Sequence, residues 1–222
     1  MNNVIVDIAE LLLLFLWVAP IVIIGMTWYA VRGLSKTPDR LTDADPNEHE
    51  DAFKRAADQQ KWAKDNGFKP AGTWMFDGSS KIFLALWQHE SDPTYFVFYF
   101  TDKHSYFDFV TRLSDDHVIT SSSSMDGLFF PMPPGFYMQC FTATDKDTLL
   151  LKHRRSGDFI ADKLSLDRTL SPIDLRQLVV GAIERQVAHI KSLPLWPFRG
   201  FYWFLFRRHM LTNKSIEDLW KD

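Results

Sequence analysis

The chain has 222 residues, a net charge of −3 and one cysteine, Cys140. This charge balance excludes a protein that binds nucleic acid through a broad basic field. A single cysteine excludes an intramolecular disulfide, and it fits a folded domain that stands in a reducing compartment.

The first feature along the chain is an apolar run near the N-terminus. No charged residue occurs between Glu10 and Arg32. A helix over this run is about 30 Å long, which matches the thickness of the hydrocarbon core of a bilayer. Trp28 and Tyr29 lie where the helix would leave the hydrocarbon, in the position of an aromatic belt. Residues 1–31 are therefore predicted to be a transmembrane anchor.

Two alternatives to a membrane span are a cleaved signal peptide and a buried helix of a soluble protein. A signal peptide begins with basic residues, whereas this chain carries Asp7 and Glu10 before the apolar run. A buried soluble helix seldom has apolar residues on every face. The sequence therefore fits a membrane span better than it fits either alternative.

Basic residues near the ends of the span predict its orientation. No Lys or Arg precedes it, and Arg32, Lys36 and Arg40 follow it. The positive-inside rule then predicts a single-pass protein with its N-terminus outside and its C-terminal domain in the cytoplasm.

Residues 32–45 are mostly polar and are expected to form a linker. A helix should follow over residues 46–66, because Asp45 can cap its N-terminus and Gly67 can end it. The apolar stripe of this helix is thin and consists largely of alanine.

The middle of the chain alternates β-rich runs with turns. Residues 81–89 and 94–101 are apolar on both faces, which predicts central strands that are covered on two sides. Further strands are expected over residues 72–76, 106–113, 117–122 and 135–142. The short connections between these runs predict antiparallel pairing.

Helical patterns return after the strands. Start signals occur at Thr144 and at Ser171, and the second should open a helix that ends near Lys191. The order of helix, strands and helices predicts an α+β domain over residues 46–192, with a mainly antiparallel β-sheet flanked by helices.

Residues 193–222 are predicted to form an aromatic interfacial segment followed by a short capped helix. The aromatic part, 193–206, is too short and too interrupted by proline to span a bilayer, but its composition suits the membrane interface. The alternatives are packing of its rings on the domain or against a partner. The membrane-interface residues predicted for the whole chain are Trp28, Tyr29, Trp196, Phe198, Arg199, Phe201, Trp203, Arg207 and Arg208.

Catalytic motifs are weak in this sequence. Asp115, Asp116 and His117 are better explained by a polar hairpin turn than by a metal site. The serines at 121–124 lack the Gly-x-Ser-x-Gly elbow that frames a nucleophile. There is no Gly-rich phosphate loop and no Cys-x-x-Cys, so we expect no catalytic residue, metal or cofactor, and more readily a non-enzyme than an enzyme.

Four residues are candidates for ligand or partner contacts. Phe129 and Phe130 can mark the mouth of an apolar pocket, and His153 and Arg154 can contact a lipid phosphate.

The leading hypothesis is a membrane-anchored binding or assembly domain at the membrane surface. Its expected partners are the lipid bilayer and subunits of a membrane complex, with no nucleic acid. The first alternative is a domain that binds lipid or a small apolar ligand. The second is a membrane-tethered hydrolase that uses His117 or His153 with a serine.

Overall fold

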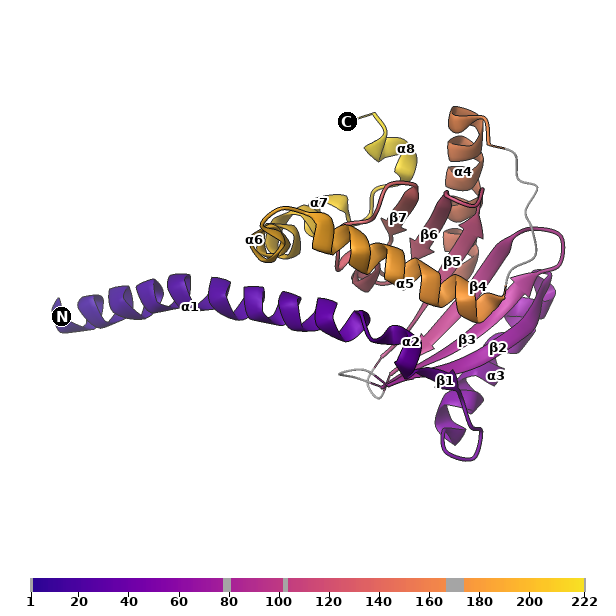
Figure 1. Ribbon diagram of the computed structural model, residues 1–222, viewed down its shortest axis with the longest axis horizontal. Helices are drawn as coiled ribbons and strands as arrows, with labels where there is room; N and C mark the ends of the chain where they lie inside the picture. The colour runs from indigo at the N-terminus through magenta and orange to yellow at the C-terminus, as the bar shows by residue number, and fades with distance from the viewer. Residues whose placement is uncertain (1, 78–80, 102–103, 167–173, 222) are drawn as a thin grey trace.

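A computed structural model describes residues 2–77, 81–101, 104–166 and 174–221 (Figure 1). These residues form one seven-stranded, mostly antiparallel sheet with helices on both faces, preceded by an apolar N-terminal helix. The predicted α+β class is confirmed at this level.

The strands lie in the sheet in chain order. They are β1 (Leu41–Asp43), β2 (Phe68–Asp77), β3 (Lys81–His89), β4 (Thr94–Phe100), β5 (Ser105–Arg112), β6 (Val118–Ser122) and β7 (Phe136–Cys140). Strands β1 to β6 pair antiparallel, as their short connections predict. Strand β7 pairs parallel with β6, because the connection through the 3-10 helix η1 (Met125–Leu128) returns the chain to the start of β6.

Helices cover both faces of the sheet (Figure 1). Helices α3 (Glu50–Asp65) and α4 (Lys146–Leu164) lie on one face, and α5 (Leu175–Ser192) crosses the other. Alternate side chains of β3 enter the two cores, Phe83 under α3 and Leu84 under α5. This arrangement explains the two-sided apolar pattern of the central strands.

The structure differs from the expected linker and from the expected start of the first helix. A short helix, α2 (Thr37–Arg40), is followed at once by β1, because Leu41 is apolar and buries its side chain in the core under α5. Helix α3 begins at Glu50 rather than at residue 46. The Asp45 side chain does not cap it, but accepts a hydrogen bond from the Asn47 backbone N–H (2.8 Å) in the preceding turn.

The two later helices follow their start signals with small differences. Helix α4 is capped by Asp145, one residue after the expected Thr144, and continues through Gly157. The expected start signal at Ser171 lies outside the described residues. Asp174 caps α5 by accepting a hydrogen bond from the Arg176 backbone N–H (2.8 Å).

The C-terminal region is helical. It contains α6 (Trp196–Tyr202), the π-helix η2 (Trp203–Arg207), α7 (Arg208–Leu211) and α8 (Ile216–Leu219). Helix α8 is the expected short capped helix, and it begins with a capping box in which the Ser215 hydroxyl and the Asp218 carboxylate each accept from the other's backbone N–H.

Helix α1 (Asn2–Leu34) projects away from the sheet and continues through Pro20 (Figure 1). Among the residues that the structure describes, it is the one helix long and apolar enough to cross a membrane, over Trp17–Leu34. Only 11% of that stretch is buried in the structure, which argues against the core helix of a soluble protein.

Candidate functional site: an aromatic surface beside the N-terminal helix

Helix α6 packs closely against the C-terminal part of α1. A Cβ atom at Gly200 would lie 3.5 Å from Oγ1 of Thr27 and 3.1 Å from the Trp196 ring. Thr27 is buried by this contact, and its hydroxyl donates to the backbone carbonyl of Ile24 (2.9 Å). Because Gly200 has no side chain, the two helices can approach each other closely. The Thr27 hydroxyl that they bury is satisfied by its hydrogen bond to Ile24.

The contact continues into a small apolar core, which we call the junction cluster. Its members come from α1, α5, α6 and the segment after η1. They are Val31, Phe130, Val187, Ile190 and Trp196, and all five are buried. The junction cluster fixes α6 to α1 and to the sheet domain together.

The opposite side of the aromatic segment is exposed. Phe198 is 64% exposed, and Tyr202 and Phe206 are each 55% exposed. Residues spaced by four share one face of a helix, so these rings form a stripe. Leu195 and Leu205 flank it and are also exposed. We call these five residues the aromatic surface.

Two rings of the same segment point the other way and hold it on the domain. The indole N–H of Trp203 donates to the backbone carbonyl of Leu128 in η1 (2.9 Å). Phe204 packs edge-on against Phe129, with 5.3 Å between the ring centroids. The aromatic surface is therefore fixed in place by contacts made on its back.

The directions of α1 and α6 differ strongly. In Figure 1, α1 runs along the long axis of the molecule, whereas α6 is seen nearly end-on. Helix α1 itself exposes a band of large apolar side chains in the half that approaches α6. They are Trp17, Val18, Ile21, Val22, Met26, Trp28 and Tyr29.

The structure divides the nine residues predicted for the membrane interface into two groups. The exposed group is Trp28, Tyr29, Phe198, Arg199 and Arg207. The buried or half-buried group is Trp196, Phe201, Trp203 and Arg208, whose guanidinium lies over the Phe204 ring (3.7 Å). Packing on the domain thus accounts for one face of the segment, and the other face is exposed.

Sequence reasoning missed four members of the aromatic surface, namely Leu195, Tyr202, Leu205 and Phe206. The signal that finds Tyr202 and Phe206 is their spacing of four from Phe198, which becomes visible once the segment is taken as a helix.

The four candidate contact residues lie in different places. Phe129 and Phe130 pack against Phe204 and Trp196, so they support the aromatic segment. Arg154 is exposed, and its guanidinium lies 3.4 Å from Nε2 of His89.

His153 lies inside the domain, in a buried polar network under α4. Its Nδ1 is 2.8 Å from Ser121 Oγ, and its Nε2 is 2.7 Å from Thr111 Oγ1. Burial lowers the pKa of His153 from 6.5 to about 3, and the nearby Arg154 charge adds to the effect. A serine and a histidine thus converge, but both are sealed from solvent, so the geometry offers a substrate no access.

Asp108 is a second buried ionisable group, on the face of the sheet that carries α5. Burial raises the pKa of its carboxyl group to about 7, against the lowering effect of hydrogen bonds from Ser122 and Tyr99. Its Oδ1 has no hydrogen-bond partner in the part of the chain that the structure describes. The surroundings of Asp108 therefore favour the neutral, protonated carboxyl group over the carboxylate.

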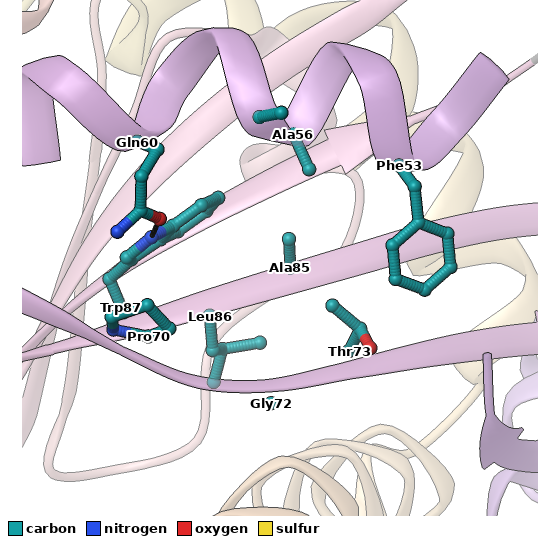
Figure 2. Close-up of a pocket in the computed structure, with 10 residues that line it drawn as sticks. Phe53, Ala56, Gln60, Pro70, Gly72, Thr73, Ala85, Leu86 and Trp87 are labelled. Atoms are coloured by element: carbon teal, nitrogen blue, oxygen red, sulfur yellow. Dashed lines mark hydrogen bonds between the residues drawn. The ribbon is translucent and has the colours of Figure 1, made fainter. Parts of the chain in front are cut away.

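A pocket of about 420 Å³ lies between α3 and strands β2 and β3 (Figure 2). Small side chains of the three elements leave the space, among them Ala56, Thr73 and Ala85. The rings of Phe53 and Trp87 form its walls, and Figure 2 shows the hydrogen bond from the Trp87 indole N–H to the Gln60 side-chain carbonyl (2.8 Å) at one end.

Comparisons with protein-family models, with curated proteins and with solved structures find no match to this chain. Within the described ranges, no group of three or more His, Cys, Asp or Glu side chains could hold a metal ion. Asp115 and Asp116 are exposed in the turn after β5, where Arg112 pairs with Asp115 (2.9 Å).

Proposed function

We propose that this is a single-pass membrane protein whose α+β domain is attached to the bilayer at two points and acts there as a binding or assembly module. Helix α1 crosses the membrane, and the aromatic surface of α6 and η2 lies in the adjoining interface. The observation that carries the proposal is the exposed stripe of Phe198, Tyr202 and Phe206 beside the apolar helix α1.

The depth of the contact supports this arrangement. Gly200 meets α1 at Thr27. Thr27 lies three residues before Ala30, close to the end of the apolar run, which is followed by the charged Arg32. That distance is about 5 Å along the helix, so α6 lies near the boundary between hydrocarbon and headgroups. Trp and Tyr are favoured at this depth, and each fully buried ring contributes about 1.5–3 kcal/mol.

The direction of α6 supports it as well. Because α6 crosses α1 steeply (Figure 1), it runs along the membrane plane when α1 spans the bilayer. The segment η2, which continues α6, is held on the domain by Trp203 and Phe204, so the exposed face of the segment is turned away from the domain. The basic residues after the apolar run, Arg32 and Lys36, favour a cytoplasmic domain.

A spin-label measurement on the full chain in phosphatidylcholine nanodiscs tests the proposal. A nitroxide is attached at Tyr202→Cys, and a matched control label at Ala57→Cys, an exposed position on α3. The native Cys140 is buried and does not compete for the label. We expect the label at 202 to collide with dissolved oxygen more than with a water-soluble nickel complex, and the label at 57 to do the reverse. A label at 202 that behaves like the label at 57 would overturn the proposal.

The pocket under α3 favours a second candidate function, the binding of a small apolar molecule. None of its ten lining residues is charged, and its volume lies in the lower part of the usual range for ligand sites. Native mass spectrometry of the full chain tests this function. An apolar molecule retained by the wild type and by Thr73→Val, but lost in the pocket-filling variant Thr73→Phe, supports it. A wild type that retains none contradicts it.

A further inference from the structure

The C-terminal third of the chain has an uneven distribution of charge. Between Glu184 and Glu217 there is no acidic residue. The same stretch contains six basic residues, Arg185, Lys191, Arg199, Arg207, Arg208 and Lys214. The whole chain has a net charge of −3, so the rest of it is correspondingly acidic. The basic stretch coincides with the segment that carries the aromatic surface.

Three of these cations stand free around the aromatic surface. Lys191 lies in the last turn of α5, Arg199 follows Phe198, and Arg207 follows Phe206, and all three are exposed. None of the three is within ion-pair distance of an acidic side chain in the described part of the chain.

Other basic groups of the stretch are already engaged. Arg185 lies 4.0 Å from the Asp116 carboxylate and over the Phe136 ring. Arg208 lies over the Phe204 ring. The unpaired charges are therefore concentrated where rings are exposed, and an anion that neutralises them must come from outside the described chain.

We propose that the aromatic surface recognises anionic phospholipid headgroups, with Lys191, Arg199 and Arg207 as the groups that contact them. This inference rests on the proposed attachment of α6 to the bilayer. Rings at the interface place the adjoining guanidinium groups at the level of the phosphates, where arginine binds with two parallel hydrogen bonds. Each cation near an anionic surface shifts the equilibrium towards the bound state about fivefold.

The charge also adds an independent argument about topology. Anionic lipids are concentrated in the cytoplasmic leaflet, so a surface that requires them stands on that side of the membrane. The basic residues that follow the apolar run, Arg32 and Lys36, favour the same side by a separate mechanism, which acts when the helix is inserted.

The full chain labelled at Tyr202→Cys tests this inference in nanodiscs of phosphatidylcholine, with or without phosphatidylserine. We expect phosphatidylserine to raise the ratio of oxygen to nickel-complex collisions several-fold at low salt, and added salt to reduce the gain. The double variant Arg199→Gln/Arg207→Gln should lose the gain. The matched control Lys54→Gln/Lys61→Gln, which removes two exposed cations from α3, should keep it.

The outcomes separate this inference from the proposed function. A label that is in the membrane with both lipid mixtures, with no effect of phosphatidylserine or of the arginine variant, overturns the recognition of anionic lipid and leaves the two-point attachment standing. A label that is in water with both mixtures overturns the attachment itself. A gain that the α3 control also loses would show a general effect of net charge and would overturn the assignment to Arg199 and Arg207.

Discussion

Gly200 of α6 lies so close to Thr27 of α1 that a single added carbon would be in contact with the Thr27 hydroxyl and pressed against the Trp196 ring. This relationship joins two segments that are more than 170 residues apart in the chain. It fixes the depth of the aromatic surface along α1, and it can be changed without altering any polar group.

Replacing Gly200 with leucine should force α6 away from α1. The added side chain meets the Trp196 ring and α1 in a packed junction, and such overpacking costs about 1–3 kcal/mol. Chemical denaturation of the full chain in detergent, followed by near-ultraviolet circular dichroism, measures the loss. Gly25→Leu is the matched control, because nothing lies within 4 Å of its added carbon. Equal stability of the two variants would contradict the close contact.

The two faces of the aromatic segment should respond differently to substitution by serine. Trp196→Ser removes a buried ring from the junction cluster and should lower the free energy of unfolding by about 3–5 kcal/mol. Phe198→Ser changes an exposed ring and should leave that free energy within about 0.5 kcal/mol, while it reduces contact with the bilayer. The same denaturation measurement compares them, and a large loss in Phe198→Ser would show that this ring packs on the protein.

His153 should make the protein more stable as the pH rises from about 3 to 6.5. Its pKa is about 3 in the folded state and near 6.5 in the unfolded state, so the unfolded state binds the extra proton in this window. The slope from this one group is at most about 1.4 kcal/mol per pH unit. Denaturation between pH 4 and pH 7 measures it, and His153→Gln should lose it. His104→Gln, at an exposed position, should keep the wild-type slope.

Asp108 should make the protein less stable as the pH rises from about 4 to 7, which is opposite to the effect of His153. Its pKa is about 7 when folded and near 3.8 when unfolded, so the folded state binds the extra proton. Its contribution is fully present below about pH 4 and is lost as the pH rises through 7. In Asp108→Asn, stability should therefore rise more steeply with pH than in the wild type. An unchanged profile would show that the carboxyl is not held in its protonated form.

The central strands were accessible to sequence analysis, because residues 81–89 and 94–101 are apolar at successive positions and only a doubly covered strand needs that pattern. The capping box at Ser215 was accessible for a similar reason, since two side chains three residues apart satisfy each other's backbone. Both features are local, and no distant part of the chain decides them.

Features that depend on contacts between distant parts of the chain could not be predicted from the sequence. Leu41 forms an edge strand only because β2 and the core under α5 are there to receive it. The prolines of the aromatic segment suggested an interrupted structure. One of them lies in the first turn of α6, where proline is tolerated because the N–H it lacks would be unbonded. His153 was a candidate for contact with a lipid phosphate, but it lies in the middle of α4, which continues to Leu164, and its buried side chain faces the sheet.

We expect the Gln139 side chain to hold the C-terminal helix α8 on the sheet. Its side-chain amide N–H donates to Ser121 Oγ (2.7 Å), and its carbonyl accepts from the Ile216 backbone N–H (3.1 Å), all out of contact with solvent. Gln139→Leu keeps the approximate volume but leaves the Ile216 N–H without its acceptor, at a cost of about 1–3 kcal/mol.

We expect Gln139→Leu to speed hydrogen exchange at the amides of α8 more than at those of β3, because the lost carbonyl accepts from the backbone N–H of Ile216, the first residue of α8. Gln88→Leu is the matched control, at an exposed position on β3. Exchange measured by mass spectrometry on the full chain distinguishes the two variants. If the Ile216 amide stays as protected in Gln139→Leu as in the wild type, another group holds α8, and the ion pair between Glu217 and Arg155 (3.2 Å) becomes the next residue pair to remove.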